Sequence, residues 1–333
     1  MISNITNNMI YNNINNQLSN ESLSIYNLED QVSSGLQINS PQDNPAGQVN
    51  ILSYQNSMSD VNQYTSNVNL ANEISSLASS TLNNAVGVVN NAKTLAIEMA
   101  NGATNTSMNN QAAANEVGQL INEVLQIANT NYNGQNIFTG ENSSQVPAYT
   151  ASQAYYSVPS STSGGTPTDV NYSVYTYAGN DVQQRYQITQ NETIAPSLTA
   201  NAIFGSSNPA PNPQNSSYSP SGLLSVLSLF QSELQSNTFT NDSSNIISGI
   251  NNGLNTLLSA QATIGTKQQR LTEQSQSYQT VTTNIKQLLS QTQDVNIPEA
   301  MTNLTQAQTT YQATLAMSSQ ITQLTPMLLK YLP

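Results

Sequence analysis

Apolar side chains recur at helical spacing near both ends of the chain, and this pattern predicts long helices there. In the first segment they alternate by three and four residues, which is typical of a narrow stripe that packs against another helix. The members of this N-terminal stripe are Tyr11, Ile14, Leu18, Ile25, Leu28 and Val32, with Glu21 and Ser22 interrupting it. Near the other end, the corresponding C-terminal stripe is Leu304, Tyr311, Leu315, Ile321, Leu324 and Leu328.

A sharp break follows the N-terminal helical stretch. Gly35 stands where a C-terminal cap belongs, because glycine adopts the left-handed backbone without a side-chain clash. Ser40-Pro41 then has the pattern of an N-cap and a first helical residue, with Asp43 in the place of a capping acid. Asn44-Pro45 repeats that pattern. The sequence therefore predicts a helix, a reorientation and a second helix that begins at one of these two prolines.

Two longer heptad patterns predict long helices in the regions flanking the middle of the chain. After the break, one heptad position holds Val61, Val68, Leu82, Val89 and Ala96, and the other holds Tyr64, Ala71, Ala78, Ala85, Ala92 and Met99. A third helix is expected between Asn101-Gly102 and Asn129. Beyond the middle, the repeating positions are Ile250, Leu257, Ile264, Leu271, Tyr278 and Ile285. The companion position of this last pattern is mostly polar, so we expect it to pack into a bundle with the alanine-rich helix.

Helical periodicity disappears between residues 141 and 221, where Pro, Gly, Tyr, Thr and Ser dominate. Val170, Tyr172 and Val174 alternate with polar residues, as in a half-buried strand. The sequence therefore predicts an α+β chain whose long N- and C-terminal helices pack as an antiparallel bundle, with a small β domain inserted mid-chain. The expected parts are a terminal helical region (1–50 and 294–333), a long-helix domain (51–140 and 222–293) and a β-rich insert (141–221).

The composition excludes several kinds of chemistry. Only 7% of the 333 residues are charged, against about 25% in an average protein. Six basic residues face 18 acidic ones without forming a cluster, which disfavours nucleic acid and anionic membranes as partners. Histidine and cysteine are absent, so the commonest metal ligands, the usual general base and thiol catalysis are missing. We expect no catalytic, cofactor-binding or metal-binding residues and no enzyme activity.

The sequence shows no basic and apolar leader typical of a cleaved export signal, and no apolar run of 18 residues. A chain without cysteine is also compatible with work outside the cell. Because so few groups ionise, we expect little of the folding free energy to depend on pH. This suggests tolerance of an acidic medium.

Several short motifs, in order and at the proper ends, resemble those of the flagellin superfamily. They comprise the break after the first helix, the exit from the third helix, an element of the long C-terminal helix and two closing motifs. In this sequence they are Ser34-Gly35-Leu36, Asn39-Ser40-Pro41, Asp43 with Pro45-Ala46-Gly47, Asn136 to Gly140, Ile264-Gly265 to Arg270-Leu271, Asp294 to Glu299, and Tyr311-Gln312-Ala313. Pro41, Pro45, Phe138 and the Tyr311 motif are most similar to the members of that superfamily that join hook to filament, whereas residues 33–40 and 325–332 are more similar to flagellin itself.

The resemblance implies a structural subunit of the bacterial flagellum, placed outside the cell and exported through the flagellar type III apparatus without a cleaved signal. Its N-terminal and C-terminal stripes would pair in an inner tube, and Gly35, Ser40, Pro41, Asp43 and Pro45 would form the joint. The implied partners are other copies of the chain in a ring-like helical assembly, the neighbouring hook-associated protein, flagellin, and an export chaperone.

Two alternatives stay open: a filament-forming flagellin, and an unrelated extracellular helical fibre or adhesin. The row of Tyr172, Tyr175 and Tyr177 also leaves room for a carbohydrate-binding face, although alternating tyrosines are more often ordinary strand residues.

Overall fold

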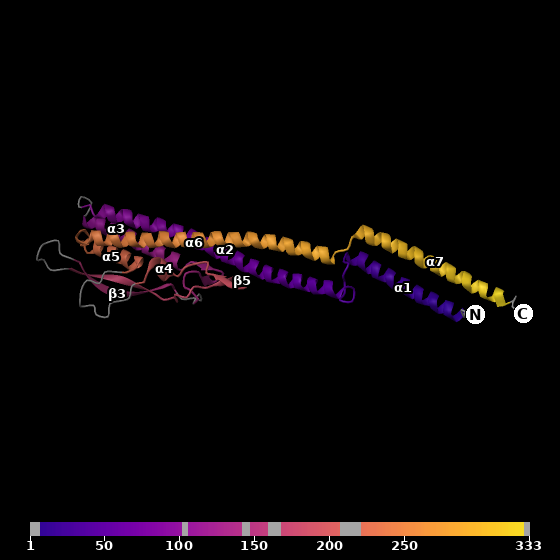
Figure 1. The fold of residues 1–333 in the computed structure, drawn as a ribbon. Coiled ribbons are helices and arrows are strands. Elements are labelled where there is room, and N and C mark those ends of the chain that lie inside the picture. Colours follow the sequence, from indigo (N-terminus) through magenta and orange to yellow (C-terminus); the bar gives the residue numbers. More distant parts are fainter. Residues whose placement is uncertain (1–6, 102–105, 142–146, 159–167, 207–220, 330–333) are drawn as a thin grey trace. The chain divides into compact units, whose positions relative to one another are not determined.

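The computed structural model describes residues 7–101, 106–141, 147–158, 168–206 and 221–329, most of them helical (Figure 1). Its helices are α1 (Asn7–Ser34), α2 (Pro45–Met99), α3 (Ser107–Ala128), α4 (Ala200–Phe204), α5 (Leu223–Gln235), the 3-10 turn η1 (Phe239–Asn241), α6 (Ser243–Gln293) and α7 (Ile297–Leu329). Its strands are β1 (Asn131–Tyr132), β2 (Gln135–Asn136), β3 (Tyr149–Val158), β4 (Thr168–Tyr177), β5 (Tyr186–Thr189) and β6 (Glu192–Ile194). The predicted α+β class, with long helices toward both ends and a small β region between them, is confirmed.

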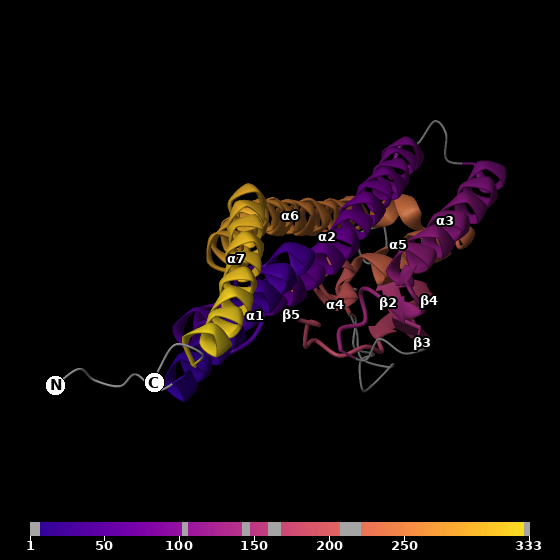
Figure 2. The ribbon, with the colours of Figure 1, turned by 90° about the vertical axis from the view of Figure 1, so that its right-hand side faces the viewer.

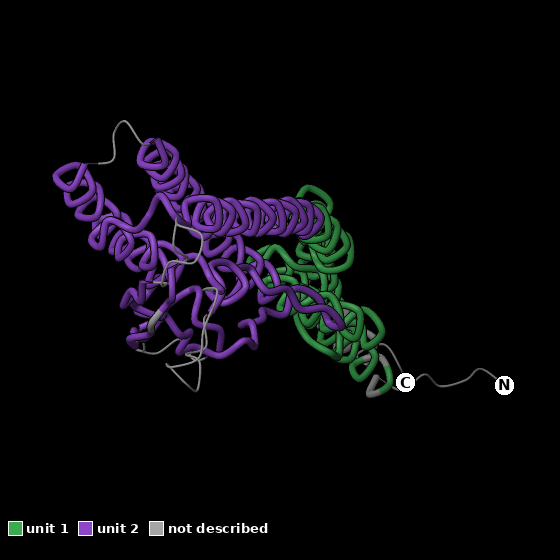
Figure 3. Tube along the Cα trace, turned by 90° about the vertical axis from the view of Figure 1, so that its left-hand side faces the viewer, with its two compact units in different colours: residues 1–62, 279–333 green, residues 63–278 purple. Residues whose placement is uncertain are grey.

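The chain divides into two compact units, coloured separately in Figure 3. The terminal unit comprises residues 1–62 and 279–333, and the middle unit comprises residues 63–278. The boundaries fall within α2 and α6. Both units are therefore built from chain segments that lie far apart in the sequence.

Heptad patterning correctly identified the buried faces of the long helices. In α2, Ala71, Ala78, Ala85 and Ala92 are fully buried. All six repeating positions of α6 are buried as well, whereas their mostly polar companions are half-buried. Most of these side chains belong to one hydrophobic cluster of the middle unit.

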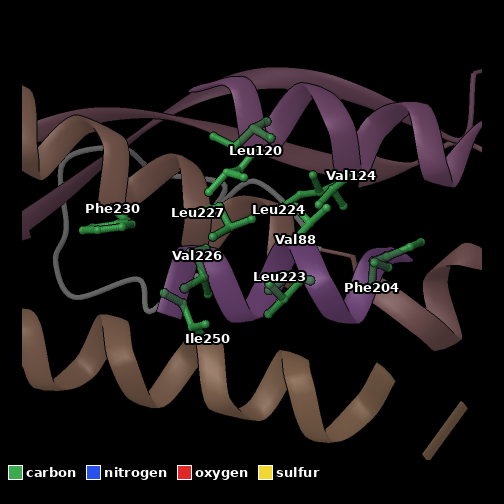
Figure 4. Packing of buried hydrophobic residues seen from close by; sticks show 14 of the residues in the cluster. Val88, Leu120, Val124, Phe204, Leu223, Leu224, Val226, Leu227, Phe230 and Ile250 are labelled. Atoms are coloured by element: carbon green, nitrogen blue, oxygen red, sulfur yellow. The ribbon is translucent and has the colours of Figure 1, made fainter. Parts of the chain in front are cut away.

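Helix α5 lies at the centre of that cluster. Every residue from Leu223 to Phe230 is buried, and side chains from α2, α3, α4 and α6 surround it (Figure 4). The predicted long-helix region (222–293) includes this stretch without a separate short helix. Between Leu223 and Phe230 only Ser225 and Ser228 are polar, so the stretch is too short and too apolar for its periodicity to be distinctive.

The β strands form three two-stranded antiparallel sheets. In the longest, Tyr149 of β3 pairs with Tyr177 of β4, and Val158 pairs with Thr168. Val170, Tyr172 and Val174 are buried, as the alternation in the sequence predicted. Because Tyr172 is only 1% exposed, the tyrosine row does not form an exposed carbohydrate-binding face.

Two serines of α5 accept hydrogen bonds from backbone amides on the edge of β4 that does not pair with β3. The backbone amide of Ser173 donates to Ser228 Oγ at 2.8 Å, and that of Tyr175 donates to Ser225 Oγ at 3.1 Å. An unpaired strand edge would otherwise leave these amides without partners in the core. Both serines are buried for this reason.

A buried carboxyl group makes the middle unit sensitive to pH. Glu233 of α5 is fully buried, and neither carboxylate oxygen has a hydrogen-bond partner among the described residues. Burial, together with the nearby charge of Asp242, raises the pKa of Glu233 from 4.5 to about 9. Glu233 is an exception to the expectation that the folding free energy of this chain hardly depends on pH.

Candidate assembly site in the terminal unit

Helices α1 and α7 lie side by side and run in opposite directions within the terminal unit (Figures 1 and 2). Each turns a narrow stripe toward the other, with half-buried side chains spaced by three and four residues. On α1 the stripe is Tyr11, Ile14, Leu18, Glu21, Ile25, Leu28 and Val32. On α7 it is Ala300, Leu304, Ala307, Tyr311, Thr314 and Ser318, of which Ala300 is buried. We call the contact between the two stripes the α1–α7 seam.

The structure brings together all six predicted residues of the N-terminal stripe and part of the C-terminal one. Leu304 and Tyr311 lie in the α1–α7 seam, but Leu315 is 44% exposed and points out of it. The side chains of Ile321, Leu324 and Leu328 lie outside the described residues. Between the predicted positions, α7 contributes small and polar side chains that a search for large apolar residues missed. Their regular spacing was the signal that could have identified them.

Glu21 is the one charged residue of the α1–α7 seam among the described side chains. Its carboxylate oxygen Oε1 accepts a hydrogen bond from Thr314 Oγ1 at 3.2 Å. The other oxygen, Oε2, is buried without a hydrogen-bond partner. The interruption at Glu21 in the sequence pattern therefore corresponds to a polar layer within an apolar contact.

The two chain segments that follow α1 and precede α7 are hydrogen-bonded to each other. Leu36 forms an antiparallel bridge with Asp294. The amide of Gln37 donates to the carbonyl of Gln293 at 2.6 Å, and the amide of Val295 donates to the carbonyl of Gly35 at 3.0 Å. These bonds join the N-terminal and C-terminal segments at the predicted joint.

Gly35 ends α1 as predicted. Its φ of 74° is left-handed, and its amide donates to the carbonyl of Gln31 at 2.9 Å. A side chain at this position would strain the backbone, because only glycine adopts this region at little cost. The turn after α1 thus depends on the Ser-Gly of the joint motif.

Of the two helix starts that the sequence left open, the structure has the second. Helix α2 begins at Pro45, and the side chain of Asn44 accepts a hydrogen bond from the amide of Gly47 at 2.9 Å. Ser40 and Pro41 belong instead to the preceding bend and turn. Asn44-Pro45 is therefore the N-cap and first helical residue.

Asp43 stabilises the turn before α2 rather than the helix itself. Its carboxylate accepts hydrogen bonds from the amides of Ser40 at 2.8 Å and Asn39 at 3.0 Å. These two bonds, that from Ser40 first, hold the pKa of Asp43 below its ordinary value. Asp43 therefore bonds to the amide of Ser40, as a capping acid would, but the two residues lie in a turn and not at the start of a helix.

The terminal unit leaves many large apolar side chains in contact with solvent. Tyr26 is 68% exposed and Leu23 is 59% exposed, although both lie on well-formed helical turns of α1. Among the described side chains of this unit, the exposed ones are Met9, Leu23 and Tyr26 of α1, Val49 and Leu52 of α2, Leu288 of α6, and Ile297, Met301, Leu315 and Met317 of α7. Where such side chains lie together on a surface, they are typical of an interaction site.

Within the described residues, no group of three acidic side chains is arranged to hold a metal ion. No described helix is both long and apolar enough to cross a membrane. The terminal unit instead has helix faces suited to contacts with other helices.

Comparisons with known proteins identify both ends of the chain. Residues 5–143 match the family model of the bacterial flagellin N-terminal helical region, and residues 247–332 match that of the bacterial flagellin C-terminal helical region. Together the two regions make up more than half of the chain. A flagellin from Clostridium tyrobutyricum is 30% identical over 178 residues, which are 53% of this chain and 45% of the relative. The alignment therefore spans less than half the length of that flagellin.

Solved structures share the fold over most of their length. A protein assigned as a flagellar hook-associated protein from Vibrio parahaemolyticus has a TM-score of 0.59 at 16% identity, covering 76% of this chain and 100% of the other. The flagellar hook-associated protein 3 from Legionella pneumophila has a TM-score of 0.57 at 14% identity, covering 72% of this chain and 98% of the other. At these identities the likeness establishes a common fold.

Proposed function

Since the chain belongs to the flagellin superfamily, we propose that it is a structural subunit of the bacterial flagellum that joins the hook to the filament, the role of hook-associated protein 3. The observation that carries this proposal is the terminal unit itself. Its helices α1 and α7 pair through one narrow seam and leave apolar side chains such as Leu23 and Tyr26 exposed. Contacts with neighbouring subunits would bury these side chains and offset the entropy lost on ordering the helices.

The extent of the shared fold favours the junction over the filament. The hook-associated protein 3 of Legionella is covered over 98% of its length, so the likeness includes more than the terminal helices of the superfamily. A filament subunit is the second candidate, and the 30% identity to a flagellin supports it. An unrelated fibre or adhesin is disfavoured by membership of the superfamily.

The proposal includes a specific set of partners. Copies of the chain would assemble through α1 and α7 into a ring-like arrangement, with the neighbouring hook-associated protein on the hook side and flagellin on the filament side. Before assembly, a chaperone would cover the exposed apolar faces during export through the flagellar type III apparatus, without a cleaved signal. The working location would be the extracellular part of the flagellum. A role in structure rather than catalysis agrees with the absence of histidine and cysteine.

Deleting the gene separates the two candidates. For a junction subunit we expect hooks to remain on the cell while flagellin accumulates unpolymerised in the medium, and a plasmid copy should restore filaments. Filaments that persist after deletion would contradict the junction role. For a filament subunit, the purified chain would instead polymerise into long filaments by itself.

A further inference from the structure

The α1–α7 seam pairs two helices of unequal apolar content. Helix α1 contributes large side chains at nearly every position, including Leu18, Ile25 and Leu28. Helix α7 contributes several small or polar ones, including Ala307 and Ser318. On apolar area alone, the helix that would best cover α1 is therefore another α1 from a second copy of the chain.

Glu21 opposes that alternative pairing in either direction. In a parallel pair of α1 helices, two Glu21 carboxylates would meet in the same layer. In an antiparallel pair with full overlap, the two Glu21 residues would again lie beside each other, because Glu21 is the middle member of the stripe. Both arrangements place like charges together, and the hydrogen-bond donor that α1 itself offers is Gln17, whose Nε2 lies 3.5 Å from Glu21 Oε1.

Helix α7 places the hydroxyl group of Thr314 next to the Glu21 carboxylate. In the layer where α1 is polar, Thr314 Oγ1 lies 3.2 Å from Glu21 Oε1 and 3.0 Å from the carbonyl of Thr310, so its one hydroxyl hydrogen can be donated to either oxygen. A hydrogen bond to a charged acceptor is stronger than one between neutral groups. Of the two helices that could cover α1, α7 places a hydroxyl group at this layer, whereas a second α1 places another carboxylate there.

We propose that Glu21 is a partner-selecting residue: it makes α1 pack against α7 and excludes a second copy of α1. The selection has a cost in stability, because Glu21 Oε2 is buried without a partner. A polar group at a single position of a helix seam commonly has this effect, since it weakens the contact and restricts which helix fits. This proposal rests on the proposed function in one respect: many copies of the chain must meet during assembly. It applies equally to a junction subunit and to a filament subunit.

The absence of native cysteine allows a direct test on the purified full-length chain. Ser22 is exposed beside Glu21, so Ser22→Cys places a single thiol on α1 with little disturbance. We would measure dimers by sedimentation and by reaction with a bis-maleimide that links two thiols. With Glu21→Leu in this background, we expect cross-linked dimer to increase about tenfold or more, because the charge that penalises α1–α1 pairing is gone. Glu21→Gln should give an intermediate increase.

Two matched controls make the result specific. Thr314→Val removes the hydroxyl from α7 but leaves Glu21 in place, so α1–α1 dimers should stay at the starting level. Ser76→Cys places the thiol on an exposed position of α2 in the middle unit, and it should give no increase with Glu21→Leu. An unchanged middle-unit thermal transition would verify folding in each variant.

Three results would overturn the proposal. The first is a dimer level in Glu21→Leu no higher than with Glu21 present. The second is an equal increase with Thr314→Val, because release of α1 from α7 would then suffice for pairing. The third is equal cross-linking through Ser76→Cys, because the copies would then associate elsewhere. None of these measurements involves the hook, so failure here is distinguishable from failure of the junction role.

Discussion

The terminal unit and the middle unit are both made largely of long amphipathic helices, but they bury their apolar side chains to different degrees. In the middle unit, α5 is enclosed on all sides, and Leu227 and Phe230 are fully buried. In the terminal unit, the α1–α7 seam holds mainly half-buried side chains. Tyr26 and Leu23 remain more than half exposed.

This difference indicates where each unit obtains its stability. The middle unit contains a closed core, so its apolar side chains gain their burial from the chain itself. The terminal unit has few such contacts and would gain most of its burial from neighbouring subunits. A chain with both kinds of region would keep its middle unit folded by itself and gain further burial in its terminal unit on assembly.

The largest effect on stability is expected from a substitution in the closed core of the middle unit. Phe230 is fully buried, with its ring centroid 4.8 Å from that of Phe239. Phe230→Ala should lower the free energy of unfolding of the middle unit by about 3 to 5 kcal/mol. Leu18→Ala in the half-buried seam is the matched comparison and should cost about 1 kcal/mol or less in the free chain. Denaturant titration of both variants checks the contrast, which equal losses would contradict.

The next effect concerns the buried carboxyl group of the middle unit. Because the pKa of Glu233 is raised to about 9 in the folded state, folding favours its protonated form. The resulting stabilisation is complete below about pH 4.5 and is lost as the pH rises toward 9. The charged group facing Glu233 is Asp242, whose carboxylate also accepts a hydrogen bond from the Tyr156 hydroxyl at 2.9 Å.

Glu233→Gln should therefore raise the free energy of unfolding at pH 8 by about 1 to 3 kcal/mol, because at that pH folding has to protonate the carboxylate, a cost that a neutral amide does not carry. At pH 4 the variant and the original chain should differ little. Thermal unfolding at both pH values measures this difference. A variant less stable at pH 8 would mean that the carboxylate has a stabilising partner in the folded chain. Tolerance of an acidic medium stays a prediction. The raised pKa of Glu233 supports it, because this group makes the folded middle unit more stable at low pH than at high pH.

A smaller effect is expected at the joint. Gly35→Ala should cost about 1 to 2 kcal/mol, because alanine is strained at a φ of 74°. The loss should appear in the terminal unit and leave the middle-unit transition unchanged. Gly87, a helical glycine with open space around its Cβ position, is the control: Gly87→Ala should be neutral or stabilising. Hydrogen exchange of α1 and α7 would show whether the effect stays within the terminal unit.

The smallest effect on stability is expected from the exposed side chains of α1. Replacing Leu23 and Tyr26 together by serine should change the unfolding free energy of the free chain by less than about 0.5 kcal/mol, because neither is buried there. Val182→Ser, at a 54% exposed position of the middle unit, serves as the control. Thermal unfolding of the original chain, the double variant and Val182→Ser, followed by circular dichroism, would measure these changes. A large loss in the double variant would mean that these residues already have partners.

Much of the fold was predictable because periodicity depends on burial. The heptads of α2 and α6 were recognised since each buried position recurs among polar ones, and the strand of Val170, Tyr172 and Val174 for the same reason at period two. The motif after α1 correctly predicted that the helix ends at Gly35, which has a left-handed backbone.

Other features depend on tertiary contacts that leave no periodic signal. Helix α5 begins with a short, mostly apolar run, and such a run does not distinguish a helix from a buried strand. In the sequence, Ser225 and Ser228 are ordinary polar residues. Their role is visible only in the structure, where each accepts a hydrogen bond from a backbone amide of β4. On α7, Ala307 and Thr314 occupy the seam whereas the larger Leu315 points outward, because the partner helix decides which stripe is covered.

The central claim is that the exposed apolar side chains of the terminal unit serve assembly onto the flagellum. The most direct test is to add the purified double variant, Leu23→Ser with Tyr26→Ser, to isolated hooks carrying the neighbouring hook-associated protein, and to measure bound subunit by co-sedimentation. The account predicts that the original chain and Val182→Ser bind equally, while the double variant stays in the supernatant. Binding of the double variant at the level of the original chain would contradict it.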